Sequence, residues 1–260
     1  AYLQPTSVLK SRHRSAAGGS TLRIGLVVFQ FSMSIALMVG SVIVFTQLRH
    51  LRTQDLGFQQ EQMLVVDFGW DGTVQQQIEA FKTEYLRLPT VHSVSVSRMV
   101  PGDFFPKAKT SVASAEGLMV EEKLELFEID ADYISHYGME MVAGRASSTD
   151  FPADSTQSLL LNEAAVRLYG YNDPEAIIGK RFSQWEREGT LIGVVKDFNY
   201  QSLHTEVAPL SLRFVPTFQL TKLSLRIESG NMSATMAEIE QLWKELAPHR
   251  PFLYTFLDDS

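Results

Sequence analysis

The chain has 260 residues, no cysteine, and a formal net charge of −7 from 23 lysines and arginines against 30 acidic residues. The absence of cysteine excludes disulfides, thiolate zinc sites, iron–sulfur clusters and cysteine nucleophiles. The charge is uneven: residues 1–48 carry four basic and no acidic residues, whereas the remainder carries 19 basic and 30 acidic residues, a net −11. We therefore expect no nucleic-acid partner, since phosphate binding needs a basic face.

The first predicted element is a membrane-spanning helix. Residues 24–45 contain no charged side chain, and a helix of that length is about 33 Å long, enough to cross a hydrocarbon core of roughly 30 Å. The run is longer than a signal-peptide core and lacks the polar stripe of a helix on a globular core. We expect a cytoplasmic basic segment at 1–22 and a transmembrane helix at 23–46.

The flanking charges predict the orientation of this helix. Basic residues and no acidic residue precede it, whereas the basic residues that follow are soon balanced by Asp55 and Glu61. The excess of basic residues marks the cytoplasmic side. The N-terminus is thus expected in the cytoplasm and the main domain outside it.

One face of the predicted span carries small side chains at intervals of four residues, namely Ser32, Ala36 and Gly40. Such a stripe lets another helix approach closely, and Gln30 is less costly facing protein than lipid. We expect these four residues to pack against other transmembrane helices. Single-span anchors also contain small residues, so a helix without a partner is the alternative.

A helical pattern continues beyond the span and ends at Gly57, which predicts a stalk over 47–62. The outer domain is expected at 63–260. It opens with a strand at 63–67, a helix at 73–88 with a capping box from Thr73 to Gln76, and a strand from Val91 to Val96.

The same strand–helix–strand order recurs at the end of the chain, with a strand at 223–227, a helix at 232–247 and a strand at 252–257. We expect both units to share one mixed sheet and the residues between them to form an inserted smaller subdomain at approximately 115–208. The predicted fold class is α+β, with one N-terminal transmembrane helix.

Motifs for catalysis and cofactor binding are missing from the sequence. The only Gly-Lys pair, Gly179-Lys180, is followed by arginine and lacks the upstream glycine of a phosphate loop. There is no His-Glu-x-x-His pair and no Gly-x-Ser-x-Gly elbow. We therefore expect no cofactor, no metal and no enzymatic activity.

Two polar clusters allow a chemical or a structural interpretation. Asp130, Asp132 and His136 could be metal ligands, but their spacing favours the cap and first turns of a short helix. The segment Lys196-Asp197-Phe198-Asn199 could hold a general base, but Asp197 and Asn199 are typical of a turn in which side chains accept from backbone amides.

Six segments in register resemble the FtsX/MacB-type permease subunits of bacterial ABC transporters. They are RIGLVVFQFSMSIAL (23–37), DLGF (55–58), MEMVAGR (139–145), LLLNEAAVRLYG (159–170), AIIGKRF (176–182) and LIGVVKDFNYQSLH (191–204). The sequence of these segments is most similar to that of the long permeases of Bacteroidetes-like bacteria. Residues 1–12 resemble the segment that precedes the second half of those permeases. The motif residues, expected to be structural, are Gly57, Gly144, Arg145, Asn162, Glu163, Gly179, Lys180, Gly193, Lys196, Asp197 and Phe198.

The resemblance implies a non-catalytic subunit with a MacB-like periplasmic core domain. A separate ABC ATPase would hydrolyse ATP, and the permease would transmit the motion across the lipid bilayer to drive a periplasmic adaptor or lipoprotein or a substrate. The resemblance also implies three further membrane helices beyond residue 260. The alternative is a membrane-anchored ligand-sensing domain of a signalling protein, and a third is an anchored envelope enzyme.

Overall fold

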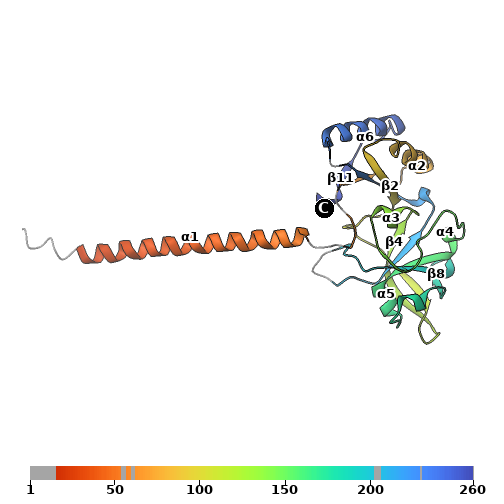
Figure 1. The fold of residues 1–260 in the computed structure, drawn as a ribbon, viewed down its shortest axis with the longest axis horizontal. Coiled ribbons are helices and arrows are strands. Elements are labelled where there is room, and N and C mark those ends of the chain that lie inside the picture. Colours follow the sequence, from red (N-terminus) through yellow and green to blue (C-terminus); the bar gives the residue numbers. More distant parts are fainter. Residues whose placement is uncertain (1–15, 54–56, 60–61, 202–205, 229, 260) are drawn as a thin grey trace, which may run out of the picture. The chain divides into compact units, whose positions relative to one another are not determined.

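The computed structural model describes residues 16–53, 57–59, 62–201, 206–228 and 230–259. The chain divides into two units, residues 1–55 and residues 56–260. In the first, helix α1 runs from Ala16 to Thr53, and its part from Leu22 to Gln47 is long and apolar enough to cross a membrane (Figure 1). The side chains from 22 to 47 are all exposed. The predicted apolar helix is therefore confirmed as a helix. Residues 1–15 of the predicted cytoplasmic segment and residues 54–56 and 60–61 of the predicted stalk lie outside the described residues.

The second unit begins with the predicted strand–helix–strand order: β1 (Met63–Asp67), α2 (Gly72–Tyr85) and β2 (Val91–Ser97). The predicted capping box at Thr73 is wrong. Asp71 caps α2 instead, because its Oδ1 accepts from the backbone amides of Thr73 and Val74 at 3.0 and 3.2 Å. A carboxylate in this position also favours the positive end of the helix dipole.

The corresponding unit at the end of the chain comprises β10 (Lys222–Ile227), α6 (Met232–Leu246) and β11 (Tyr254–Phe256). Both units share one sheet, in the order β11–β1–β10–β2, with antiparallel pairing throughout. Helices α2 and α6 lie side by side (Figure 1), and Phe81 meets Trp243 edge to face at 5.5 Å between ring centroids. Their apolar faces make one continuous core with the sheet.

The residues between these units contribute most of the remaining strands. The sheet continues from β2 through β4 (Met119–Ile129), β3 (Lys107–Ala113), β7 (Arg181–Gln184), β8 (Arg187–Val195) and β6 (Ser158–Asn162) to β9 (Leu210–Phe214). Because β9 also pairs with β4 in parallel, these last six strands close into a barrel. A closed barrel leaves no free strand edge. The boundaries 115–208 of an inserted subdomain stay a prediction.

Strand β4 belongs to both parts of the sheet, since Ile129 at its end pairs with Ser97 of β2. A short strand, β5 (Met141–Gly144), pairs with β8 outside this order. Three short helices and three single 3₁₀ turns complete the second unit: α3 (Tyr133–His136), α4 (Asp154–Gln157), α5 (Glu163–Leu168), η1 (Pro174–Ile177), η2 (Thr217–Gln219) and η3 (Leu257–Asp259). The predicted mixed α+β class is confirmed.

Candidate functional site

Several motif residues meet where β6 enters α5 and β8 ends. Asn162 caps α5 as predicted: its Oδ1 accepts from the amides of Ala165 at 3.0 Å and Leu210 at 2.9 Å, and its Nδ2 donates to the carbonyl of Ala208 at 3.0 Å. Asn162 is fully buried. Its amide group thus joins α5 to the start of β9.

Glu163 and Asp197 hold the two motif turns together. Asp197 accepts from the amide of Ala164 at 2.9 Å and from Arg167 at 2.6 Å, and its own amide donates to Glu163 Oε2 at 2.9 Å. This arrangement matches the predicted turn, in which the Asp197 carboxylate satisfies a backbone amide. A carboxylate held by these donors is a structural acceptor, which leaves little basis for a general base.

The glycines of the motifs allow close backbone contacts. Gly144 has φ +64°, and a Cβ there would lie 2.3 Å from the carbonyl oxygen of Ile192. A Cβ on Gly193 would lie 2.3 Å from the carbonyl of Arg145, and one on Gly57 (φ +80°) would lie 2.9 Å from Cβ of Phe198. These three positions therefore require glycine for steric reasons.

Two charged motif residues, Arg145 and Lys196, form ion pairs; the partner of Arg145 is buried, and that of Lys196 is exposed. Arg145 binds both carboxylate oxygens of Asp154, at 2.5 and 2.9 Å, and stacks over Phe151 at 4.2 Å. Burial raises the pKa of Asp154, but the hydrogen bonds from Arg145 and from the amide of Ser148, together with the charge of Arg145, outweigh burial, and the net pKa is lowered. Lys196 pairs with Glu140 at 2.8 Å.

Gly179 and Lys180 lie in the turn before β7. Gly179 has φ +77°, and its amide donates to the carbonyl of Leu191 at 2.8 Å. The side chain of Lys180 is exposed. The four helix-packing candidates lie along the exposed surface of α1, so their role stays a prediction; they are Gln30, Ser32, Ala36 and Gly40.

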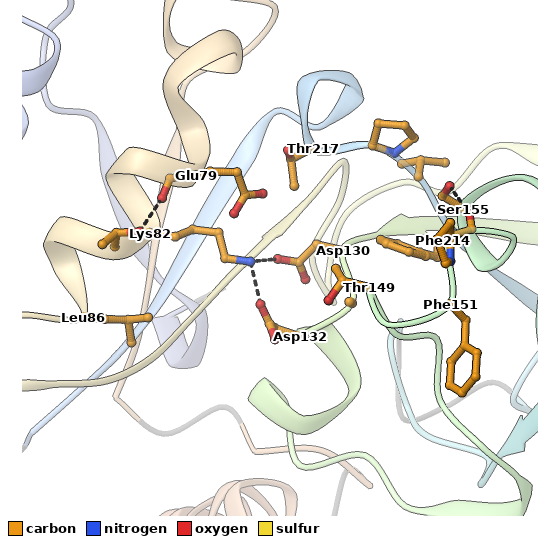
Figure 2. Close-up of a pocket in the computed structure, with 15 residues that line it drawn as sticks. Glu79, Lys82, Leu86, Asp130, Asp132, Thr149, Phe151, Ser155, Phe214 and Thr217 are labelled. Atoms are coloured by element: carbon orange, nitrogen blue, oxygen red, sulfur yellow. Dashed lines mark hydrogen bonds and ion pairs between the residues drawn. The ribbon is translucent and has the colours of Figure 1, made fainter.

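The structure also shows a charged cavity that sequence analysis missed. It has a volume of about 570 Å³ and lies between α2, the start of α3, the loop before α4 and the segment after β9. Figure 2 shows the ammonium group of Lys82 between two carboxylates: Nζ lies 2.7 Å from Asp130 and 2.6 Å from Asp132. Apolar walls come from Leu86, Phe151 and Phe214.

The ion pairs of Lys82 with Asp130 and Asp132 link α2 to the segment that follows β4, and Asp130 in turn links this segment to β2. Asp130 is buried and also accepts from the hydroxyl of Ser95 at 2.7 Å and the amide of Val96 at 2.9 Å. Burial alone would lower the pKa of Lys82, but Asp130 and Asp132 overcome it and the pKa is raised. Lys82 thus stays protonated and is unsuited to act as a base or nucleophile.

The alternative metal-site interpretation of Asp130, Asp132 and His136 has no support among the described residues, which hold no group of three or more side chains suited to a metal. Asp132 occupies the N-cap position of α3, as the structural interpretation expected, but its side chain makes no capping hydrogen bond. Both carboxylates bind Lys82 instead. Lys82 was missed because lysine on a predicted amphipathic helix normally faces solvent. Its position four residues after Ile78, on the buried face, was the only available signal.

No family model and no curated protein matches the chain. Among solved structures, the crystal structure of the periplasmic region of MacB from Actinobacillus actinomycetemcomitans aligns with a TM-score of 0.55 at 16% identity, covering 80% of this chain and 94% of that one.

Two further matches have lower TM-scores. A domain of a putative permease protein from Porphyromonas gingivalis gives a TM-score of 0.47 at 15% identity, with coverages of 72% and 85%. The extracellular domain of the noncanonic ABC-type transporter YknZ from Gram-positive bacteria gives 0.49 at 14% identity, with coverages of 74% and 97%. The MacB alignment carries the conclusion on the fold: the chain has the mixed α+β fold of the MacB periplasmic region, and an apolar helix precedes it in the sequence.

Proposed function

We propose that this chain belongs to a non-catalytic permease subunit of an ABC transporter, and that it transmits motion from a partner ATPase across the inner membrane to its periplasmic domain. The observation that carries the proposal is a MacB-like domain that follows directly on a helix able to span a membrane. The motif resemblance to FtsX/MacB-type permeases, including the Bacteroidetes-like long permeases, points the same way.

The internal construction of the domain supports a mechanical role. The motif side chains that could have carried chemistry are engaged in holding the fold: Asn162 joins α5 to β9, and Asp197 joins β8 to α5. Backbone contacts at Gly144 and Gly193 leave no room for a side chain. A domain that transmits force must resist deformation. Close backbone contacts and buried hydrogen bonds make the domain resistant to deformation.

The topology and partners form part of the same proposal. Residues 1–22 would lie in the cytoplasm with the ABC ATPase, residues 23–46 would cross the bilayer, and 47–62 would act as a stalk. A second permease copy or further helices would cover the small-residue face of α1. Outside, the domain at 63–260 would act on a periplasmic adaptor, a lipoprotein or a substrate.

The decisive experiment is reconstitution of the full-length protein with a candidate ATPase, a phosphate-loop protein to be sought among the products of neighbouring genes. We expect the pair to co-purify and the ATPase rate in lipid to depend on the permease. An ATPase with its phosphate-loop lysine changed to alanine is the control, since it should still bind but not hydrolyse ATP. Failure to associate, together with an unchanged ATPase rate, would contradict the proposal. A signalling helix and a kinase encoded beyond residue 260 would instead support the alternative function, a membrane-anchored sensor.

A further inference from the structure

The interior of the barrel changes character along its length. At one end, its side chains are apolar and form one core: Val112, Leu124, Leu159, Leu161, Phe182 and Leu191. At the other end, Nε2 of Gln184 on β7 donates to Thr110 Oγ1 on β3 at 2.8 Å and to Ser211 Oγ on β9 at 3.0 Å. Since β7 and β9 are not neighbours in the sheet, these bonds cross the ring. The barrel is polar inside at this end.

Charged side chains gather at the same end. Glu128 on β4 lies opposite Arg213 on β9, and Arg187 on β8 lies opposite Gln184. Glu128 and Arg187 are buried, with 5% and 7% of their surface exposed. Arg98, at the end of β2, donates to Glu128 Oε2. Glu128 forms an ion pair with Arg98 only, and its charge also acts on Arg187 and Arg213. One carboxylate thus serves three guanidinium groups at this end of the barrel.

Of these three arginines, Arg213 has the fewest hydrogen-bond partners to compensate its positive charge. Its Nε and Nη1 are buried and have no hydrogen-bond partner in the part of the chain that the structure describes. Arg187, by contrast, donates to the carbonyls of Phe214 at 2.9 Å and Ser158 at 3.3 Å. Burial lowers the pKa of Arg213, and Glu128 opposes this only in part. An uncompensated buried cation is costly, so an anion placed here would be favourable.

Two tryptophans lie over the same arginines. The guanidinium of Arg98 lies 5.1 Å from the ring centre of Trp70, and that of Arg213 lies 5.3 Å from Trp185. Both rings are largely exposed, at 64% and 54%. Trp185 has φ +52° in the turn between β7 and β8, a conformation that bulky residues rarely adopt and that often marks a functional position.

We propose that this arginine–tryptophan surface, formed by Trp70, Arg98, Trp185, Arg187 and Arg213, docks a carboxylate-bearing segment of a partner protein. A carboxylate of that segment accepts from Arg98, whose side chain is 37% exposed, and is attracted by the uncompensated charge of the nearby Arg213. The two indole rings pack against the backbone and side chains of the segment. Arginine and tryptophan are the residue types that dominate binding energy at protein interfaces. None of these five residues lines the cavity at Lys82. An open surface of this kind favours an extended segment over an enclosed small molecule.

The inference goes beyond the proposed transport role, since a docking surface would serve a sensor equally well. Its test uses tryptophan fluorescence of the whole chain in dodecyl maltoside micelles, titrated at low salt with acetyl-hexaglutamate-amide. Two of the three tryptophans belong to the surface, and the third, Trp243, is buried elsewhere. We expect a saturable change with the hexaglutamate peptide and none with its hexaglutamine counterpart.

Variants assign the binding to the surface. Arg213→Gln should raise the Kd about tenfold or more, a cost of about 1.4 kcal/mol. Arg145→Gln is the matched control, because Arg145 also stacks over an aromatic ring but is neutralised by Asp154; its Kd should stay unchanged. Trp185→Ala, at an exposed position, covers the case in which Arg213→Gln fails to fold, and it should weaken binding as well.

Three outcomes would overturn the inference. They are equal binding of the two hexapeptides, an unchanged Kd in folded Arg213→Gln or Trp185→Ala protein, and full displacement of hexaglutamate by N-acetylglutamate at matched carboxylate concentration. The last would show a site for a small carboxylate instead of a protein segment. Circular dichroism of each variant would confirm that it is folded before its Kd is compared.

Discussion

At the scale of single residues, Lys82 shows how much a buried charge depends on its partners. Replacing it by methionine leaves the buried Asp130 with no cation, and breaking a buried pair from one side typically lowers the free energy of unfolding by about 3–5 kcal/mol. Urea unfolding followed by circular dichroism measures this. Lys109→Met is the control, since Lys109 and its partner Glu121 are both exposed and little change is expected. Equal losses of unfolding free energy in the two variants would contradict a stabilising role of Lys82 between α2 and Asp130.

His136 predicts a pH dependence of stability. It is 2% exposed and binds Ser93 through Nδ1 at 2.8 Å, and burial, with Arg226 and Lys82 nearby, lowers its pKa to about 3 from the ordinary 6.5. The unfolded chain therefore binds more protons between these values, so stability is present above pH 6.5 and is lost as pH falls below it. The loss approaches about 1.4 kcal/mol per pH unit.

Unfolding midpoints measured from pH 6.5 to pH 5 test this dependence above the ordinary titration range of carboxylates. His136→Gln keeps a hydrogen-bonding group for Ser93 but cannot be protonated. We expect its stability to change less over this window than that of the unaltered chain. The same slope in both proteins would assign the effect to other groups.

Two glycines with positive φ separate steric contact from backbone strain. Gly144→Ala adds a Cβ 2.3 Å from the carbonyl of Ile192, whereas Gly179→Ala meets nothing within 4 Å. Strain alone costs about 1 kcal/mol, so we expect about that loss for Gly179→Ala and a clearly larger one for Gly144→Ala. Chemical unfolding of both variants gives the comparison, and losses of similar size would show that the backbone at Gly144 adjusts.

At the scale of elements, the hydrogen bonds of a cap residue to its own helix were predictable, whereas its bonds to distant parts of the chain were not. Asn162 was correctly predicted as a cap, but its bonds to β9 were not, because its partners lie 46 and 48 residues away. The start of α2 was misplaced by two positions, since both Asp71 and Thr73 are suitable cap residues in the sequence. Only the fold decides which of two neighbouring candidates reaches the helix amides.

The two asparagine caps give a matched prediction. Asn231 caps α6 with a single bond to Ala234 at 3.3 Å, so Asn231→Ala should cost about 1 kcal/mol. Asn162→Ala should cost about 2–4 kcal/mol, because it also leaves the buried amide of Leu210 without its partner and removes one of the two side-chain hydrogen bonds to the carbonyl of Ala208. Urea unfolding of both variants measures the difference, and similar costs would show that the links to β9 contribute little.

At the scale of the whole molecule, the cysteine-free sequence allows a direct test of topology. Single cysteines at Ser11 and Glu188 would lie on opposite sides of the membrane in the proposed arrangement. In intact spheroplasts, a membrane-impermeant maleimide should label Glu188→Cys but not Ser11→Cys, and lysis should expose both. The opposite pattern would place the MacB-like domain in the cytoplasm and contradict the predicted orientation.

The sequence by itself determined the apolar helix, the two strand–helix–strand units and the absence of familiar catalytic motifs, because each depends on periodicity or spacing within a few residues. Only the tertiary structure decided the closure of the barrel through β4 and β9, the burial of Lys82 between two aspartates, and the gathering of Arg98, Arg187 and Arg213 around Glu128. Those features join residues far apart in the chain. Their partners are set by strand order and register, which local sequence patterns do not specify.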